Sequence, residues 1–190
     1  NQLNETLPSS EVSSVPGHRD WQTGEFAVPG LIPFPGWVVI AENELGEVLL
    51  VSQEAGAVVR RLYAWRYSPL QGWQPQQLVS ESSSTHQSVR ASIDLQGNMM
   101  VAWVNDAGGS RDLYASYSPR EGSFDAPELI EQYSGDEHYS GDVLSFEHLE
   151  FADDGSAFAC WRQQRPHFFA GQLEPQTVSA VINRFEPISG

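Results

Sequence analysis

The chain has 190 residues and a formal net charge of −15 at pH 7, and every basic residue apart from histidine is an arginine. A charge this negative disfavours binding to nucleic-acid phosphates and to anionic membrane surfaces. Strand-favouring residues recur in short bursts between Gly, Pro, Asn and Ser, and no long stretch has a 3.6-residue period. This pattern predicts an all-β chain, long enough for a sizeable core.

The N-terminal segment Asn1–Asp20 is rich in Ser, Pro, Glu and Asn, so we expect a flexible leader. The next segment, Gly24–Ile32, matches Gly122–Ile130 without a gap, because Gly, Phe, Pro, Leu and Ile coincide. Gly72–Val79 is a looser third copy. A proline favours an edge strand, since it cannot donate to a β-ladder. Each copy is therefore predicted to be the outermost strand of its sheet.

A turn flanked by two strand-like runs occurs three times, around Gly46, Gly97 and Gly155. In the middle copy, the turn Asp94-Leu-Gln-Gly-Asn98 interrupts the run Ala91–Trp103. Glycine adopts the positive φ that a short hairpin turn needs, and the Asp94 side chain can bond its own backbone. The three glycines are 51 and 58 residues apart, a period typical of blade-type β repeats.

One full repeat contains four predicted strands, which consecutive hairpins would join into an antiparallel meander. In the middle repeat they span Ser88–Ile93, Asn98–Val104, Asp112–Ser118 and Phe124–Glu131. Such a meander is the blade of a β-propeller. We therefore predict an all-β propeller over residues 21–190. Its blades span 36–80, 87–131 and 143–190, and strand 24–32 supplies the fourth strand of the last blade. Trp103 and Trp161 should pack between blade faces.

The repeat resembles the sialidase-like propeller repeats of bacterial secreted and surface proteins. The resemblance rests on Asp94-Leu-Gln-Gly-Asn98 with Val101-Ala-Trp103, on Leu113-Tyr-Ala-Ser-Tyr-Ser-Pro119 and on Ala126-Pro-Glu-Leu-Ile130. It implies a propeller fold and a secreted, periplasmic or cell-surface location. True sialidases carry Ser-x-Asp-x-Gly-x-x-Trp boxes between the third and fourth strands of a blade. Here the Asp/Gly turns fall between the first and second strands, which argues against sialidase activity.

The order of the repeated segments does not decide how the propeller ring closes. Two chains that exchange the N-terminal strand would form a six-bladed ring with twofold symmetry. This arrangement is similar to small propeller lectins assembled from short subunits. The alternatives are a three-bladed ring and a piece of a longer propeller that has further blades.

The favoured function is a binding module for carbohydrate or protein, with a sialidase-like glycoside hydrolase and a structural assembly module as alternatives. Aromatic rings stack on sugar C–H faces, and charged side chains bond hydroxyl groups. The candidate ligand-binding residues are Trp65, Arg66, Trp73, Arg90, Tyr117 and His148. Arg90 and His148 both lie seven residues before a turn glycine, on strands expected to line the propeller channel. Ordinary packing is the alternative role for all six, and a buried pair is the expectation for Arg90 and His148.

Two long segments interrupt the repeat. Glu131–Asp142 contains Tyr-Ser-Gly-Asp twice, and its Asp136, Glu137 and Asp142, with His138, suit Ca²⁺; the alternative is a solvated loop. No other cofactor is expected. Arg162–Thr177 is predicted to be an expanded loop with aromatic residues beside Arg and His. The single cysteine, Cys160, excludes an intrachain disulfide and is expected to be buried and inert.

Overall fold

The computed structural model of the chain describes residues 28–30, 37–54, 58–106, 111–130, 142–169 and 172–186. Within these ranges the regular structure is entirely β-strand, and no helix is present. No helix of the described residues is therefore long and apolar enough to cross a membrane. The prediction of an all-β chain is confirmed.

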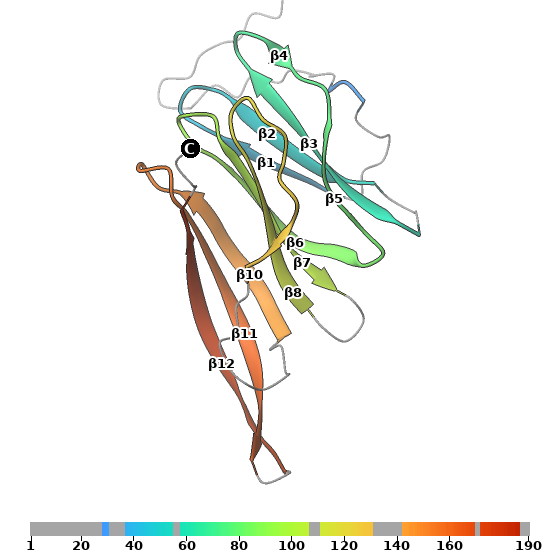
Figure 1. The fold of residues 1–190 in the computed structure, drawn as a ribbon, viewed down its shortest axis with the longest axis vertical. Coiled ribbons are helices and arrows are strands. Elements are labelled where there is room, and N and C mark those ends of the chain that lie inside the picture. The colour runs from blue at the N-terminus through green and yellow to red at the C-terminus, as the bar shows by residue number, and fades with distance from the viewer. Residues whose placement is uncertain are drawn as a thin grey trace, which may run out of the picture.

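The strands form three antiparallel sheets that follow one another along the chain and fan out in space (Figure 1). Sheet 1 contains β1 (Val38–Glu42), β2 (Val48–Gln53), β3 (Arg60–Ser68), β4 (Gly72–Trp73) and β5 (Gln77–Ser82). Sheet 2 contains β6 (Thr85–Ile93), β7 (Met99–Asp106), β8 (Arg111–Ser118) and β9 (Glu128–Leu129). Sheet 3 contains β10 (Asp142–Phe151), β11 (Ala157–Phe169) and β12 (Gln172–Phe185).

Each sheet is a meander in which consecutive strands pair, as the repeat predicts. Sheet 1 departs from the expected four strands, because its outermost strand is divided. The short β4 pairs with Tyr67 and Ser68, whereas β5 pairs with the Arg60–Ala64 part of the same strand β3. Pro75 lies between β4 and β5 and has no N–H to donate, which explains why the ladder breaks there.

The three turns that organise the repeat have the same backbone geometry. Gly46, Gly97 and Gly155 have φ values of 73°, 83° and 81°, in the left-handed region that favours glycine. In the middle turn, the Asn98 amide donates to Asp94 Oδ1 over 2.7 Å, so the predicted role of Asp94 is confirmed. The turns fix the register of the first two strands of each sheet.

The core consists of two apolar layers, one on each side of sheet 2. One layer joins sheets 1 and 2 and contains Leu49, Val51 and Trp103. The other joins sheets 2 and 3 and contains Met100, Phe146 and Trp161. Trp103 and Trp161 are fully buried, so the prediction that they pack between sheet faces is confirmed. The first strands of the three sheets are neighbours in space, since β6 of sheet 2 contacts both β1 of sheet 1 and β10 of sheet 3.

Arg162–Thr177 is not a loop, because the backbone of β11 pairs with β12 from Ala157↔Phe185 out to Phe169↔Gln172. Pro166 is accommodated at an irregularity between Arg165 and His167, where a proline interrupts little of the ladder. Sheet 3 has three strands in the described ranges. The leader and most of strand 24–32, which was predicted to complete this sheet, lie outside those ranges.

Candidate functional site

A polar cavity of about 490 Å³ lies where the end of sheet 1 meets the turns of sheet 2. Sheet 1 contributes Glu47 just before β2, Arg66 and Ser68 near the end of β3, and residues on both sides of β4. Sheet 2 contributes the turn that follows β8. The lining residues are Glu47, Arg66, Ser68, Leu70, Gln71, Gln74, Arg120 and Glu121. Convergent polar groups in a concave site are typical of small-molecule binding.

The carboxylate of Glu47 is buried at this cavity and has two side-chain hydrogen-bond donors, one cationic and one neutral. Arg120 Nη2 donates to Glu47 Oε1 over 2.8 Å, and Asn43 Nδ2 donates to Glu47 Oε2 over 3.0 Å. Arg120 comes from sheet 2 and is about half exposed, whereas Glu47 is almost completely buried. The ion pair therefore crosses the sheet-to-sheet boundary and holds a guanidinium at the cavity mouth.

Arg66 is the buried cation of the site, with 6% of its surface exposed. Its Nη2 donates to the backbone oxygen of Gly97 in the turn of sheet 2. Its Nε is buried and has no hydrogen-bond partner in the described part of the chain. A guanidinium carries five N–H donors, so this contact with a neutral carbonyl leaves most of its bonding capacity unused.

Burial lowers the pKa of Arg66 below its ordinary value. The negative charges of Glu47 and Asp94 oppose this shift, and the positive charge of Arg120 adds to it. Desolvation dominates because no carboxylate forms an ion pair with this guanidinium in the described residues. An anionic or hydroxyl-rich group in the cavity would stabilise the charged form of Arg66.

The outer wall of the cavity is formed by two glutamines that flank β4, Gln71 before it and Gln74 after it. Gln74 Nε2 donates to Gln71 Oε1 over 2.8 Å, and the backbone N–H of Gln71 donates to Ser68 Oγ over 3.1 Å. These side chains are more exposed than Arg66 and Glu47 and supply both donors and acceptors. The site therefore has a charged interior, and its more exposed rim combines these neutral amides with the Arg120 guanidinium.

The predicted ligand-binding residues do not gather at one place. Arg66 lines the polar cavity. Trp73 does not line it but precedes Gln74, which lies at the rim of this cavity. Trp65 is 1% exposed, and its Nε1 donates to the backbone oxygen of Pro29, so its ring is not an open platform. Tyr117 faces sheet 3 instead, 5.2 Å from the ring of Phe185.

Arg90 and His148 are exposed, so the expectation of a buried pair is wrong. Both lie on the first strand of their sheet, at an edge that no further strand of the described residues covers. Arg90 Nε donates to the backbone oxygen of Glu147 over 3.4 Å, whereas His148 Nε2 lies 2.7 Å from Glu150 Oε2. Burial was expected for Cys160 as well, but its thiol is partly exposed, because it points to the outer face of sheet 3.

The proposed calcium ligands are not tested by the structure. Asp136 and Glu137 lie outside the described residues, and so does the side chain of Asp142. Within the described ranges, no group of three His, Cys, Asp or Glu side chains is placed to hold a metal ion.

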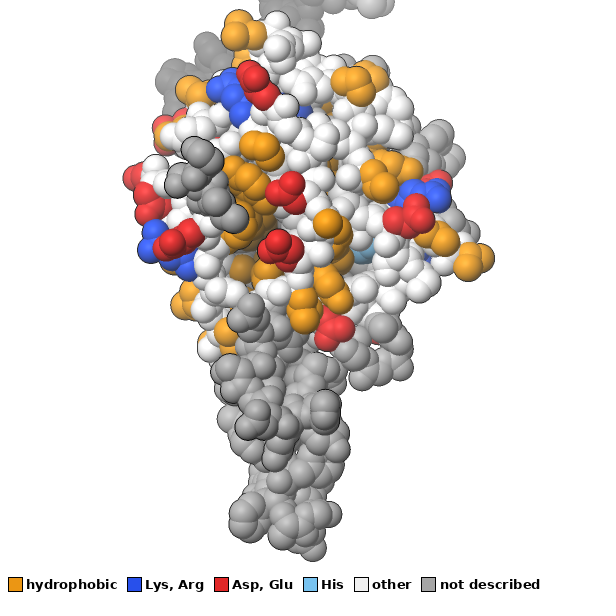
Figure 2. All heavy atoms as spheres, in the orientation of Figure 1, with side chains coloured by type: hydrophobic (Ala, Val, Ile, Leu, Met, Phe, Trp, Pro, Cys, Tyr) orange, Lys and Arg blue, Asp and Glu red, His pale blue; other side chains and the backbone are white. Residues whose placement is uncertain are grey.

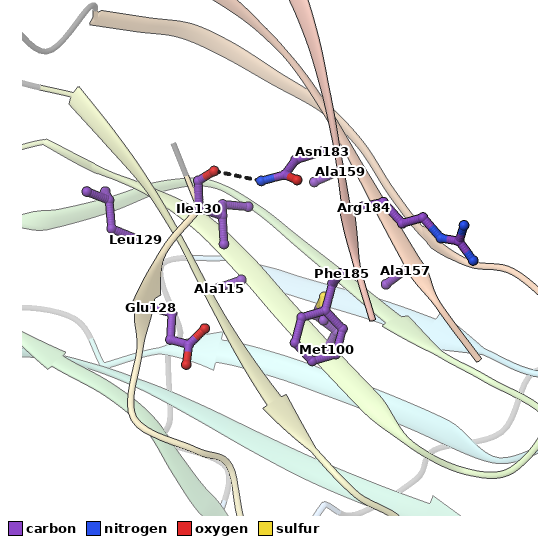
Figure 3. A pocket seen from close by; sticks show the side chains of 10 residues that line it. All are labelled: Met100, Ala115, Glu128, Leu129, Ile130, Ala157, Ala159, Asn183, Arg184 and Phe185. Atoms are coloured by element: carbon purple, nitrogen blue, oxygen red, sulfur yellow. Dashed lines mark hydrogen bonds between the residues drawn. The ribbon is translucent and has the colours of Figure 1, made fainter. Parts of the chain in front are cut away.

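A second cavity, of about 260 Å³, lies between sheets 2 and 3 (Figure 3). Its walls are mainly apolar and include Met100, Ala157 and Phe185, and Asn183 Nδ2 donates to the backbone oxygen of Ile130 over 3.0 Å at its edge. The charged residues that line it, Glu128 and Arg184, are both exposed, and Arg184 pairs with Asp154, so no buried charge among the described residues faces this cavity. We therefore regard the polar cavity between sheets 1 and 2 as the candidate functional site.

Sequence reasoning missed Glu47, Arg120 and the glutamines of the rim. The available signal was the position of Glu47, since the other two turns have Asn98 and Ser156 there. A glutamate that begins a strand and faces a neighbouring sheet needs a cationic partner.

No protein-family model and no curated protein matches the chain. Among solved structures, the chain is similar to one described as "Crystal structure of polysaccharide lyase Uly1", with 7% sequence identity and a TM-score of 0.46. The similarity covers 77% of this chain but spans only 38% of the lyase chain.

Proposed function

We propose that the chain is a carbohydrate-binding module whose sheets are blades of a β-propeller, and that it binds saccharide in the polar cavity between sheets 1 and 2. The observation that carries the proposal is the buried Arg66, which has one donor on the Gly97 carbonyl and an unpartnered Nε. A secreted, periplasmic or cell-surface location belongs to the same proposal.

Three successive meanders support the propeller arrangement. Their first strands follow one another, and their faces pack through apolar layers. In this arrangement the cavity lies between adjacent blades, close to the turns that join the first and second strands. Adjacent blades supply different walls, so a ligand there would contact residues distant in the sequence.

The chemistry of the walls supports a sugar-like ligand. Sugar hydroxyls donate and accept hydrogen bonds, and the Gln71 and Gln74 amides do both. A saccharide carboxylate would neutralise the buried Arg66 charge, since guanidinium–carboxylate hydrogen bonds are about twice as strong as neutral ones. We therefore expect tighter binding of carboxylate-bearing saccharides than of their neutral counterparts.

The test is glycan-array screening followed by calorimetry with the best saccharide and its carboxylate-reduced form. Gln71→Ala and Gln74→Ala should each weaken binding about fivefold or more, because each removes a neutral hydrogen bond of about 1 kcal/mol. Gln96→Ala, an exposed glutamine outside this cavity, is the matched control and should bind normally.

Arg66→Lys tests the buried cation, since it keeps the charge but removes the planar fork. The expected loss of affinity should be largest for the carboxylate-bearing saccharide. Equal affinities of wild type and all three cavity variants for every saccharide would contradict the proposal. Cleavage of the bound saccharide by the wild-type protein would also contradict it and would identify an enzyme.

A further inference from the structure

Sheets 1 and 3 each pack one face on sheet 2, and their other faces, called the open faces, have no neighbouring sheet in the described residues. On the open face of sheet 1, Leu50 and Trp65 are buried near residues 28–30, so only the part over β1 is exposed. The open face of sheet 1 exposes Ile40, at 64%, together with Val38. The open face of sheet 3 exposes Ile182, at 70%, together with Phe158 and Val178. Hydrophobic side chains are also visible at several places on the described surface in Figure 2. Clustered exposure of this kind marks interaction surfaces.

The exposed residues occupy repeat positions that face a neighbouring sheet at the interfaces inside the chain. Ile40 and Leu149 both lie six residues before the turn glycine of their sheets, and Leu149 is buried against sheet 2. Ile182 pairs with the fifth residue after Gly155, and Ala64 in sheet 1 pairs with the fifth residue after Gly46. Ala64 is buried against sheet 2. The open face of sheet 1 therefore corresponds to the face of sheet 3 that packs on sheet 2. The open face of sheet 3 corresponds to the face of sheet 1 that packs on sheet 2.

Two hydrogen bonds at equivalent positions of sheets 3 and 1 show the same correspondence between the two sheets. Asn183 of sheet 3 donates to the backbone oxygen of Ile130, just after β9, the outermost strand of the preceding sheet. Trp65 has the equivalent position in sheet 1, since both residues pair with the fourth residue after a turn glycine. Trp65 donates to the backbone oxygen of Pro29. Pro29 aligns with Pro127, so residues 28–30 lie against sheet 1 as the outermost strand of a preceding sheet would.

We propose that the open face of sheet 3 in one chain packs on the open face of sheet 1 in a second copy of the same chain. The contact would continue the series of sheet-to-sheet interfaces that already joins sheets 1, 2 and 3. Two copies would make this contact twice and close a ring of six sheets, with residues 28–30 contributed to the seam between copies.

A second copy is the indicated partner because the chain carries both complementary faces. Within one chain these faces do not cover each other, since Ile40 and Ile182 remain largely exposed. The proposal is independent of ligand binding, so saccharide affinity and assembly can fail separately.

Light scattering tests the proposal. The wild-type chain at micromolar concentration should have twice the mass of one chain. Ile40→Asp and Ile182→Asp should each raise the dimer dissociation constant ~100-fold, because each buries an unpaired carboxylate in the contact. Both side chains are exposed in a single chain, so neither variant should unfold it. Val58→Asp, which changes an exposed valine on the β2–β3 connection, is the matched control and should remain dimeric.

Mixing distinguishes this contact from one between identical faces. An equal mixture of the Ile40→Asp and Ile182→Asp chains can form pairs with one unmodified contact, and such pairs should appear at raised concentration. A monomeric wild type, an open-ended assembly, or dissociation by only one of the two variants would overturn the proposal.

Cys160 gives an independent readout, because it pairs with Ile182 and shares the open face of sheet 3. Its alkylation by iodoacetamide should be at least tenfold slower in the wild-type chain than in Ile40→Asp, whose substitution lies on the other sheet. Equal alkylation rates in these two proteins would overturn the proposed contact even if the wild type were dimeric.

Discussion

Asn43 donates a hydrogen bond from its side-chain Nδ2 to the backbone oxygen of Asp94 over 2.7 Å, and the two residues hold the same position in successive turns. The Oδ1 of Asn43 also accepts from the amides of Leu45 and Glu47 in its own turn. One side chain therefore closes the turn of sheet 1 and attaches it to the turn of sheet 2. The third turn has Ala152 at this position.

Replacing Asn43 by alanine should lower the free energy of unfolding by about 1–3 kcal/mol, because buried donors and acceptors lose their partners. Urea denaturation followed by tryptophan fluorescence measures the change. Asn183→Ala is the matched control, since it removes one exposed hydrogen bond to Ile130 and should cost less. Equal losses in the two variants would contradict the role assigned to Asn43.

Alanine substitutions at Gly97 and Gly155 allow the cost of backbone strain to be measured separately from the cost of steric contact. Both have a positive φ, but a Cβ at Gly97 would lie 2.9 Å from Glu47 Oε2, whereas one at Gly155 would meet nothing within 4 Å. Gly155→Ala should therefore cost only about 1 kcal/mol of conformational strain. Gly97→Ala should cost about 1–3 kcal/mol more, because Glu47 and Arg120 must move. Chemical denaturation of both variants gives the comparison, and equal costs would exclude the steric term.

The sheets could be predicted because their signals are local. The glycine turns, the short apolar run at the start of Met99–Asp106, and the prolines of the outer strands each depend on a few neighbouring residues. The hairpin formed by β11 and β12 was expected, but its extension through Arg162–Thr177 was missed, because this segment breaks the repeat and was interpreted as a loop. The place of Pro166 at a strand irregularity becomes apparent only once the register is known.

The candidate site could be predicted only in part, because its contacts join distant segments. Arg66 was identified as a charged residue beside aromatic ones. Glu47 and Arg120 are 73 residues apart, and their ion pair exists only because sheet 1 packs on sheet 2 in one register. Trp65 was proposed as a ligand platform, but the burial of its ring depends on residues 28–30, far away in the sequence.

His86 should make stability depend on pH. It is buried beside Trp103, and desolvation, together with the charge of Arg60, lowers its pKa from 6.5 to about 4. As the pH falls below 6.5 the unfolded chain binds the proton first, so stability is lost between about pH 6.5 and pH 4. The contribution of His86 should fall by about 2 kcal/mol between pH 7 and pH 5.

The comparison with His86→Gln isolates this contribution, since the other titrating groups are shared. Denaturant unfolding at both pH values should show a smaller loss of stability at pH 5 in the variant than in the wild type. An identical pH dependence in the two proteins would show that His86 is protonated equally in the folded and unfolded states.

Trp65 and Trp161 allow a hydrogen bond to be measured separately from packing. Both rings are fully buried, but Trp65 Nε1 donates to Pro29 over 2.8 Å, while Trp161 Nε1 has no partner in the described part of the chain. Substitution by phenylalanine removes a similar volume at either site. Trp65→Phe should therefore destabilise the fold by about 1 kcal/mol more than Trp161→Phe, because it alone removes a hydrogen bond and leaves a carbonyl without its donor. Urea denaturation followed by far-UV circular dichroism measures both losses independently of the tryptophan signal. A larger loss for Trp161→Phe would mean that residues 28–30 do not hold this position against sheet 1.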